Sequence, residues 1–212
     1  MAGAVLLLLF VAPFSKNLAF GGAGMLVVIL IARMAMDLTN REERRLFQLE
    51  RRAARGASGE EDVGLILDTL NPDDYLVLHD IVSPYGNIDH MVIGRYTGIF
   101  LIETKAHRGK VTVGDGRVLV NGRVPEKDFI AQALRNTYWL RDILRQELAS
   151  HVWIIPVLVF TNALVPRMEP VKGIQILNKR YLAGFLRTKH STLPIELWQN
   201  AGRILEILSS AI

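Results

Sequence analysis

Two short apolar segments joined by a tight turn constrain this chain more than any other feature. Ile88–Gly94 and Gly98–Ile102 are rich in β-branched and aromatic side chains and are bounded by glycines, which is typical of buried β-strands. Between them, Arg95–Thr97 fits a three-residue loop, and Gly98 fits the bulge residue with positive φ that closes such a loop. The sequence therefore predicts a buried antiparallel hairpin.

The length of the predicted turn determines which side chains meet at the open end of the hairpin. With a three-residue loop, Asp89 lies directly opposite Glu103, and Lys105 lies two residues further along the same face. A two-residue turn would shift the register by one residue and would move Glu103 to the other face. The chemistry of this region therefore depends on the odd-numbered loop.

Two carboxylates that face each other repel unless a cation lies between them. Because oxygen ligands favour hard divalent ions, Asp89 and Glu103 predict a site for Mg²⁺ or Mn²⁺. Beside such an ion, Lys105 would orient or help deprotonate a water, or would stabilise developing charge on a phosphoryl oxygen. The alternative is that Glu103 and Lys105 are ordinary polar residues that pair with each other at the end of a strand.

A wider set of motifs resembles one protein family. Gly86–His90, Gly98–Phe100 and Ile102–Lys105 look like the core of the nuclease-related domain family, a branch of the restriction-endonuclease-like superfamily with an Asp…Glu-x-Lys site pattern. The resemblance covers about Gly56 to Phe160. It implies an α/β fold with a mixed β-sheet flanked by helices, and a metal-dependent phosphodiesterase site.

The same resemblance implies three supporting residues. Glu60, in a Gly-Glu pair, would contribute a further carboxylate, and Gln132 would bond a phosphate, a water or the lysine. The carbonyl of Thr104 would be a further metal ligand. The residues alone allow simpler roles. Glu60 also suits the first turn of a helix, where the helix dipole favours acids. Gln132, four residues before Asn136, also suits the polar edge of an amphipathic helix.

The first 36 residues predict a membrane anchor. Ala2–Phe14 is a short apolar run, and Leu18–Met36 has about the 20 residues that a spanning helix needs. One span with a short companion and a hairpin of two helices both fit, and a buried core helix is the simpler alternative. A signal peptide fits less well, because no basic residue precedes the apolar run. Six arginines within residues 41–55 then place the remainder of the chain in the cytoplasm.

The predicted organisation has three parts: an anchor over residues 1–36, a basic helical stalk and linker over 37–58, and a nuclease-related domain over 59–212. We expect Gly56–Gly59 to break the stalk helix and a new helix to begin at Glu60. The further predicted elements are strands at Tyr75–His79, Gly109–Gly114, Arg117–Val120, Val152–Phe160 and Ile174–Leu177, and helices at Pro125–Leu148, Lys179–Leu186 and Leu193–Leu208.

Composition sets wider limits. The chain has 25 basic and 21 acidic residues, and its net charge of +4 permits binding to nucleic acid without arguing strongly for it. The absence of cysteine excludes disulfides and thiolate metal sites. Basic residues on or near the second hairpin fit either a phosphate-binding rim or a solvated face: His107, Arg108, Lys110, Arg117, Arg123 and Lys127.

These features together predict a nuclease anchored in the cell membrane, with its domain in the cytoplasm. It would use Mg²⁺ or Mn²⁺ to hydrolyse nucleic acid, in the first place DNA, although the sequence does not separate DNA from RNA or indicate an oligomeric state. One alternative is a non-catalytic module of the same fold that binds nucleic acid or protein at the membrane. Another is a membrane scaffold that uses the domain to oligomerise. Fold analogy alone does not choose between them.

Overall fold

A computed structural model describes residues 53–148 and 152–188 without a gap. It also describes residues 33–34, 36, 46–47, 50–51, 190, 193, 195–199, 204 and 208. The chain divides into two compact units, Met1–Arg52 and Ala53–Ile212. The fold described below is that of the second unit.

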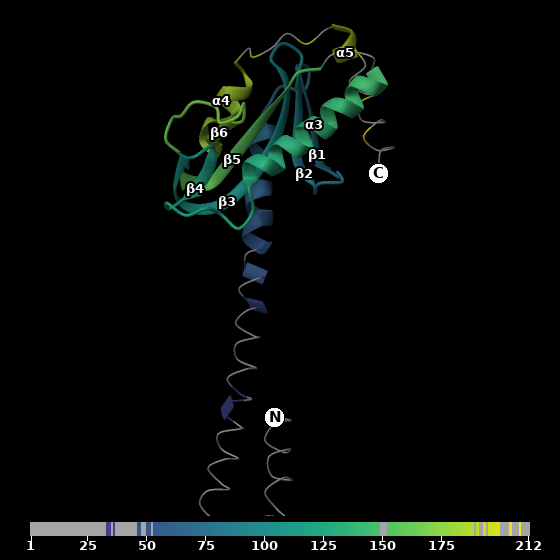
Figure 1. Cartoon of the computed structure of the whole chain (residues 1–212). Helices are drawn as coiled ribbons and strands as arrows, with labels where there is room; N and C mark the ends of the chain where they lie inside the picture. Colours follow the sequence, from purple (N-terminus) through teal and green to yellow (C-terminus); the bar gives the residue numbers. More distant parts are fainter. Residues whose placement is uncertain are drawn as a thin grey trace, which may run out of the picture. The chain divides into compact units, whose positions relative to one another are not determined.

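A mixed six-stranded sheet forms the centre of this unit (Figure 1). Its strands are β1 (Tyr75–Ile81), β2 (Ile88–Gly94), β3 (Gly98–Gly114), β4 (Arg117–Val120), β5 (Ile154–Leu164) and β6 (Gln175–Asn178). The order is β1-β2-β3-β5-β6, and β4 pairs with β3. Strands β1, β2 and β3 are antiparallel neighbours, whereas β3, β5 and β6 run parallel to one another. The mixed α/β architecture predicted from the sequence is therefore present.

The register of the β2–β3 hairpin confirms the three-residue loop. His90 lies opposite Ile102 and Gly94 lies opposite Gly98, which has a φ of 115°. Strand β3 does not end after the hairpin, as the sequence predicted, but continues to Gly114 as one strand of 17 residues. It is extended by parallel pairing with β5, which continues as far as Lys110 opposite Leu164, across a register shift between Lys105 and Arg108.

Helices cover both faces of the sheet. They are the helix over residues 53–67, α3 (Phe129–Leu148), the 3₁₀ turn η3 (Lys179–Tyr181), α4 (Leu182–Leu186) and α5 (Ile195–Gln199). Helix α3 begins at Phe129 rather than at Pro125, because the Asp128 carboxylate caps it by accepting a hydrogen bond from the Ala131 N–H at 3.0 Å.

Strand alternation divides the β3 side chains between two cores. Ile99 and Leu101 pack in one cluster with Leu140 and Leu144 of α3. Phe100 and Ile102 pack in a second cluster, on the opposite face, with Val63 of the helix over residues 53–67. Continued alternation places the odd-numbered Glu103 and Lys105 on the α3 face of the sheet.

The helix over residues 53–67 passes through the glycines that were expected to break it. Gly59 is buried, and a Cβ built on it would lie 3.1 Å from the Cβ of Ala106 and 3.2 Å from Oγ1 of Thr161. The glycine therefore permits a close approach of the helix to β3 and β5. The predicted break was wrong because a glycine selected for helix–sheet packing has the same sequence signature as a helix terminator.

This interpretation predicts opposite effects for alanine at two neighbouring glycines. Gly59→Ala is expected to lower the free energy of unfolding by about 1 kcal/mol, because the fixed Ala106 Cβ leaves little room. Gly56→Ala is the matched control, since no described atom lies within 4 Å of a Cβ built there, and it should gain about 0.5–1 kcal/mol from helix propensity. Urea unfolding of both variants checks this, and a gain for Gly59→Ala would contradict the close approach.

The predicted membrane anchor lies outside the described residues, except for Arg33, Met34 and Met36. Among the residues that the structure does describe, no helix is both long enough and apolar enough to cross a membrane.

Candidate functional site

Asp89 lies where the β2–β3 ladder ends. The last paired residues of the two strands at this end are His90 and Ile102. Next to them, the Oδ2 of Asp89 accepts a hydrogen bond of 2.5 Å from the backbone N–H of Thr104. Burial and, second, the negative charge of Glu103 raise the pKa of Asp89 from 3.8 to about 7. The carboxyl is thus held in an environment that disfavours its charge, next to a second carboxylate.

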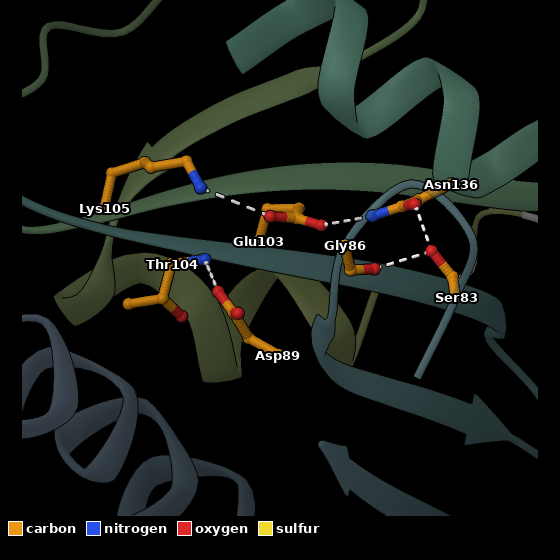
Figure 2. Close-up of polar contacts among 7 residues, drawn as sticks. All are labelled: Ser83, Gly86, Asp89, Glu103, Thr104, Lys105 and Asn136. Atoms are coloured by element: carbon orange, nitrogen blue, oxygen red, sulfur yellow. Dashed lines mark hydrogen bonds and ion pairs between the residues drawn. The ribbon is translucent and has the colours of Figure 1, made fainter. Parts of the chain in front are cut away.

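Glu103 is buried beneath α3, with a relative exposure of 1%. Its Oε1 accepts a hydrogen bond from Nδ2 of Asn136 at 2.9 Å, and its Oε2 lies 3.2 Å from the Lys105 ammonium (Figure 2). The simple ion pair considered from the sequence therefore exists. It is almost entirely buried, because only 14% of the Lys105 side chain is exposed.

A polar chain behind Glu103 was missed from the sequence. Asn136 is fully buried, and its Oδ1 lies 2.8 Å from the hydroxyl of Ser83, in the loop between β1 and β2 (Figure 2). The Ser83 hydroxyl also lies 2.6 Å from the carbonyl of Gly86. The only sequence signal was an asparagine on the inward face of α3, four residues after Gln132. The loop serine has no periodic pattern that would have indicated it.

Removing the Asn136 amide is expected to destabilise the protein by about 2 kcal/mol. Asn136→Leu fills a similar volume but leaves the buried Glu103 carboxylate without one donor. Urea unfolding measures the loss, and in a Glu103→Gln background the same substitution should cost markedly less, because no buried charge then needs the donor. Equal losses in both backgrounds would show that Asn136 does not act through Glu103.

Lys105 is fixed from two sides. Its ammonium contacts Glu103 and also lies 5.3 Å from the centre of the Phe129 ring, at the start of α3. His107 contacts the same ring, with ring centres 5.1 Å apart. Burial, followed by the charges of Lys105 and Arg55, lowers the pKa of His107. Positive charge therefore gathers beside the two carboxylates.

Two of the three residues assigned through the family resemblance, Glu60 and Gln132, lie on the helices that flank the sheet. Glu60 is on the helix over residues 53–67, past its first turn, and its charge contributes to raising the pKa of Asp89. Gln132 is half-buried on α3, one turn before Asn136. Its side chain makes no hydrogen bond within the part of the chain that the structure describes. The structure thus brings Asp89, Glu103 and Lys105 together, with Glu60 within electrostatic range.

His90 belongs to the other face of the sheet. It is buried, and its Nδ1 lies 2.8 Å from Nδ1 of His79. Burial and the neighbouring His79 lower the pKa of His90 from 6.5 to about 4, so its ring is neutral at physiological pH. Strand alternation accounts for this placement, because it puts His90 and Met91 on opposite faces of the sheet.

The carboxylates of Asp89 and Glu103 determine which metal ions this region could bind. Among the described residues, no three or more His, Cys, Asp or Glu side chains are grouped so as to hold a metal ion. The two carboxylates, Asp89 and Glu103, would nevertheless suit Mg²⁺, which keeps several waters and uses one or two protein carboxylates. Such donors would suit a hard cation with few protein ligands rather than zinc, which prefers Cys and His.

Comparison with known proteins finds a match in the part of the chain that contains the candidate site. A model of the nuclease-related domain family matches residues 55–161, just over half of the chain, and this range includes every candidate site residue. An uncharacterized protein of Bacillus anthracis is 42% identical over 60 residues, which cover 26% of this chain and 28% of that protein. The match thus spans well under two thirds of the relative. No solved structure gives a significant match.

Proposed function

Because the chain belongs to the nuclease-related domain family, we propose that it is a metal-dependent nuclease that hydrolyses phosphodiester bonds of nucleic acid. One observation supports this most directly. Burial and, second, the charge of Glu103 raise the pKa of Asp89, and the ammonium of Lys105 lies 3.2 Å from the Glu103 carboxylate. Charges of this kind, gathered at a cost in stability, are typical of functional sites.

Asp89, Glu103 and the Thr104 carbonyl would hold Mg²⁺ or Mn²⁺. When bound, such an ion supplies a water of lowered pKa and neutralises charge on a phosphoryl oxygen. Lys105 would orient the attacking water or donate to a non-bridging oxygen, since Glu103 and Phe129 already fix its position. Glu60 would add a supporting carboxylate, and the amide of Gln132, which has no hydrogen bond among the described residues, would contact the phosphate or the water.

Exposed side chains beyond the site, the cations Arg108 and Lys110 and the neutral His107, would bind the nucleic acid backbone. His107, Arg108 and Lys110 continue along β3 from Lys105, and all three are exposed. Phosphate contacts of this type position the substrate without reading its sequence, and they weaken as salt increases.

We further propose that residues 1–36 anchor the chain in the cell membrane and that the arginines in 41–55 keep the nuclease-related domain in the cytoplasm. The support is the length of the Leu18–Met36 apolar run and the charge that follows it. Alkaline carbonate extraction of membranes tests the proposal: an anchored chain stays with the lipid, whereas a peripheral one is released.

A second candidate function is a non-catalytic module that binds nucleic acid. The observation that favours it is that both carboxylate oxygens of Glu103 already have protein partners, Asn136 and Lys105. With both oxygens occupied by Asn136 and Lys105, Glu103 would need no metal ion, and the domain would bind nucleic acid without cutting it.

One assay separates the two functions. Labelled DNA and RNA are incubated with the purified chain in Mg²⁺, in Mn²⁺ and in EDTA, and binding is measured on the same samples. Metal-dependent cleavage that Glu103→Gln abolishes supports the nuclease. Tight binding with no metal-dependent cleavage in any sample favours the binding module.

A further inference from the structure

An aromatic hollow lies along the outer side of α3. Its walls include Tyr85 from the β1–β2 loop and Arg135, Tyr138, Trp139 and Asp142 from α3, and its volume is about 350 Å³. The four α3 residues recur at helical spacing, so they form one stripe along the helix. Tyr85 and Tyr138 are each 50% exposed. Two tyrosine rings at a surface hollow offer faces on which a planar group can stack.

The hollow carries positive charge next to its rings. The guanidinium of Arg141 lies 5.0 Å from the centre of the Tyr138 ring, and Arg145 is exposed one turn further along the helix. Asp142 is the acidic residue of this group, and it is paired with Arg141 at 2.8 Å. With Arg135, three arginines outnumber one carboxylate among the described side chains of this surface, so it favours a ligand that has both flat rings and negative charge.

Hydrogen bonds connect this hollow to the candidate site. The backbone N–H of Tyr85 donates to the Ser83 hydroxyl at 3.1 Å, and Ser83 contacts Asn136, whose amide donates to Glu103. Figure 2 shows the loop that carries Ser83 and Gly86 beside Asn136 of α3. Arg135, on α3, directly precedes Asn136. We expect a strand bound at the candidate site and running along α3 to reach the two tyrosines.

We propose that this hollow binds unpaired nucleobases, so that the preferred nucleic acid of this chain is single-stranded near the bond to be cut. This inference rests on the proposed nuclease function and adds the substrate class. Stacking on Tyr85 and Tyr138 needs an accessible base face, which a continuous duplex does not offer because each base is covered by its neighbours. Arg135 and Arg141 would contact the phosphates of the same strand.

The test uses the whole 212-residue chain in detergent and in EDTA, so that binding is measured without cleavage. Fluorescence anisotropy gives the Kd for a labelled oligothymidylate and for a duplex of the same length at one salt concentration. Tyr138→Ala is expected to weaken single-strand binding about tenfold, and Tyr138→Phe, which keeps the ring, by less than about twofold. Duplex binding should not change.

Tyr96→Ala is the matched control. Tyr96 is 60% exposed and has the guanidinium of Arg95 5.1 Å from its ring centre, but it lies in the β2–β3 turn. A loss there equal to that of Tyr138→Ala would overturn the inference, as would equal losses for both probes, or no single-strand binding by the wild-type chain.

The inference and the nuclease proposal fail separately. Metal-dependent cleavage together with single-strand binding that is insensitive to Tyr138 overturns the inference and leaves the nuclease. Single-strand binding that depends on Tyr138, without cleavage in Mg²⁺ or Mn²⁺, supports the inference and overturns the nuclease.

Discussion

Asp89→Asn is expected to make the metal-free protein more stable at pH 8. The folded protein holds the pKa of Asp89 at about 7, against 3.8 for an unperturbed carboxyl, so ionisation is opposed in the folded state. At about 1.4 kcal/mol per unit, this penalty reaches up to about 4 kcal/mol above pH 7. The asparagine carries no charge, and its amide oxygen can still accept the hydrogen bond from Thr104.

The sign of the effect gives its pH dependence. Because the folded-state pKa is raised, the penalty is absent below about pH 3.8, grows as the pH rises, and is complete above about 7. The stability difference between Asp89→Asn and wild type should therefore grow from pH 4 to pH 8 in urea unfolding. The exposed Asp142, paired with Arg141, provides a control, since Asp142→Asn should show no such growth.

Added Mg²⁺ should reverse the order of the two proteins. A ligand that binds only the folded state stabilises it by about 2.7 kcal/mol at one hundred times its Kd. Wild type should gain this stability, and Asp89→Asn should gain little, because one of the two carboxylates is gone. If Asp89→Asn were less stable than wild type at pH 8 without metal, the Asp89 charge would be stabilising, and the metal-site interpretation would be wrong.

The hairpin could be predicted because its signals are local. Two apolar segments, a three-residue loop and Gly98 fix the register of β2 against β3, and the structure has that register. The same count predicted that Asp89 faces Glu103 at the open end, but the paired ladder ends at His90 and Ile102, and Asp89 instead accepts a hydrogen bond from the Thr104 N–H. The family resemblance, carried by the same residues, agrees with the match over residues 55–161.

The remaining features depend on contacts between distant segments. From the sequence, Gly59 predicts the end of a helix, whereas in the structure Ala106 and Thr161 pack against it. The continuation of β3 past the hairpin as far as Lys110 is explained by β5, which lies about 50 residues further along the sequence, and its last residues to Gly114 pair with β4. In the same way, the contact of Asn136 with Glu103 spans 33 residues. The pattern of a single sequence does not indicate which distant residues come into contact, so the hydrogen bonds that hold Glu103 in place were not predicted.

Burial argues that the Glu103–Lys105 pair is more than a structural ion pair. Replacing a buried ion pair by well-packed apolar residues is often neutral or stabilising, so such a pair is weak evidence for stability. Here the interior holds two carboxyl groups, Asp89 and Glu103, against the single ammonium of Lys105. An excess acid at this position raises the energy of the metal-free fold. A function that requires the charges explains the arrangement better than a contribution to stability does.

Lys105→Met is expected to reduce kcat for nucleic acid cleavage by about 10²–10³, while metal binding persists. Methionine keeps most of the side-chain length and its packing on Phe129, but it removes the ammonium that would contact the water or the phosphoryl oxygen. Because the removed charge is positive and lies close to Asp89 and Glu103, Mg²⁺ should stabilise this variant at least as much as wild type. Single-turnover cleavage and Mg²⁺-dependent unfolding measure the two effects separately.

Lys105→Arg and Lys179→Met complete the experiment. If Lys105 only neutralises Glu103, arginine should restore cleavage, because it keeps the charge. If a compact ammonium is needed at the reacting atoms, the broader guanidinium should not restore it. Lys179 pairs with Asp62 at 2.6 Å near the surface, so Lys179→Met removes a more exposed Lys–carboxylate pair and should leave kcat unchanged. Full activity in Lys105→Met would reject a chemical role for Lys105, whatever Glu103 contributes.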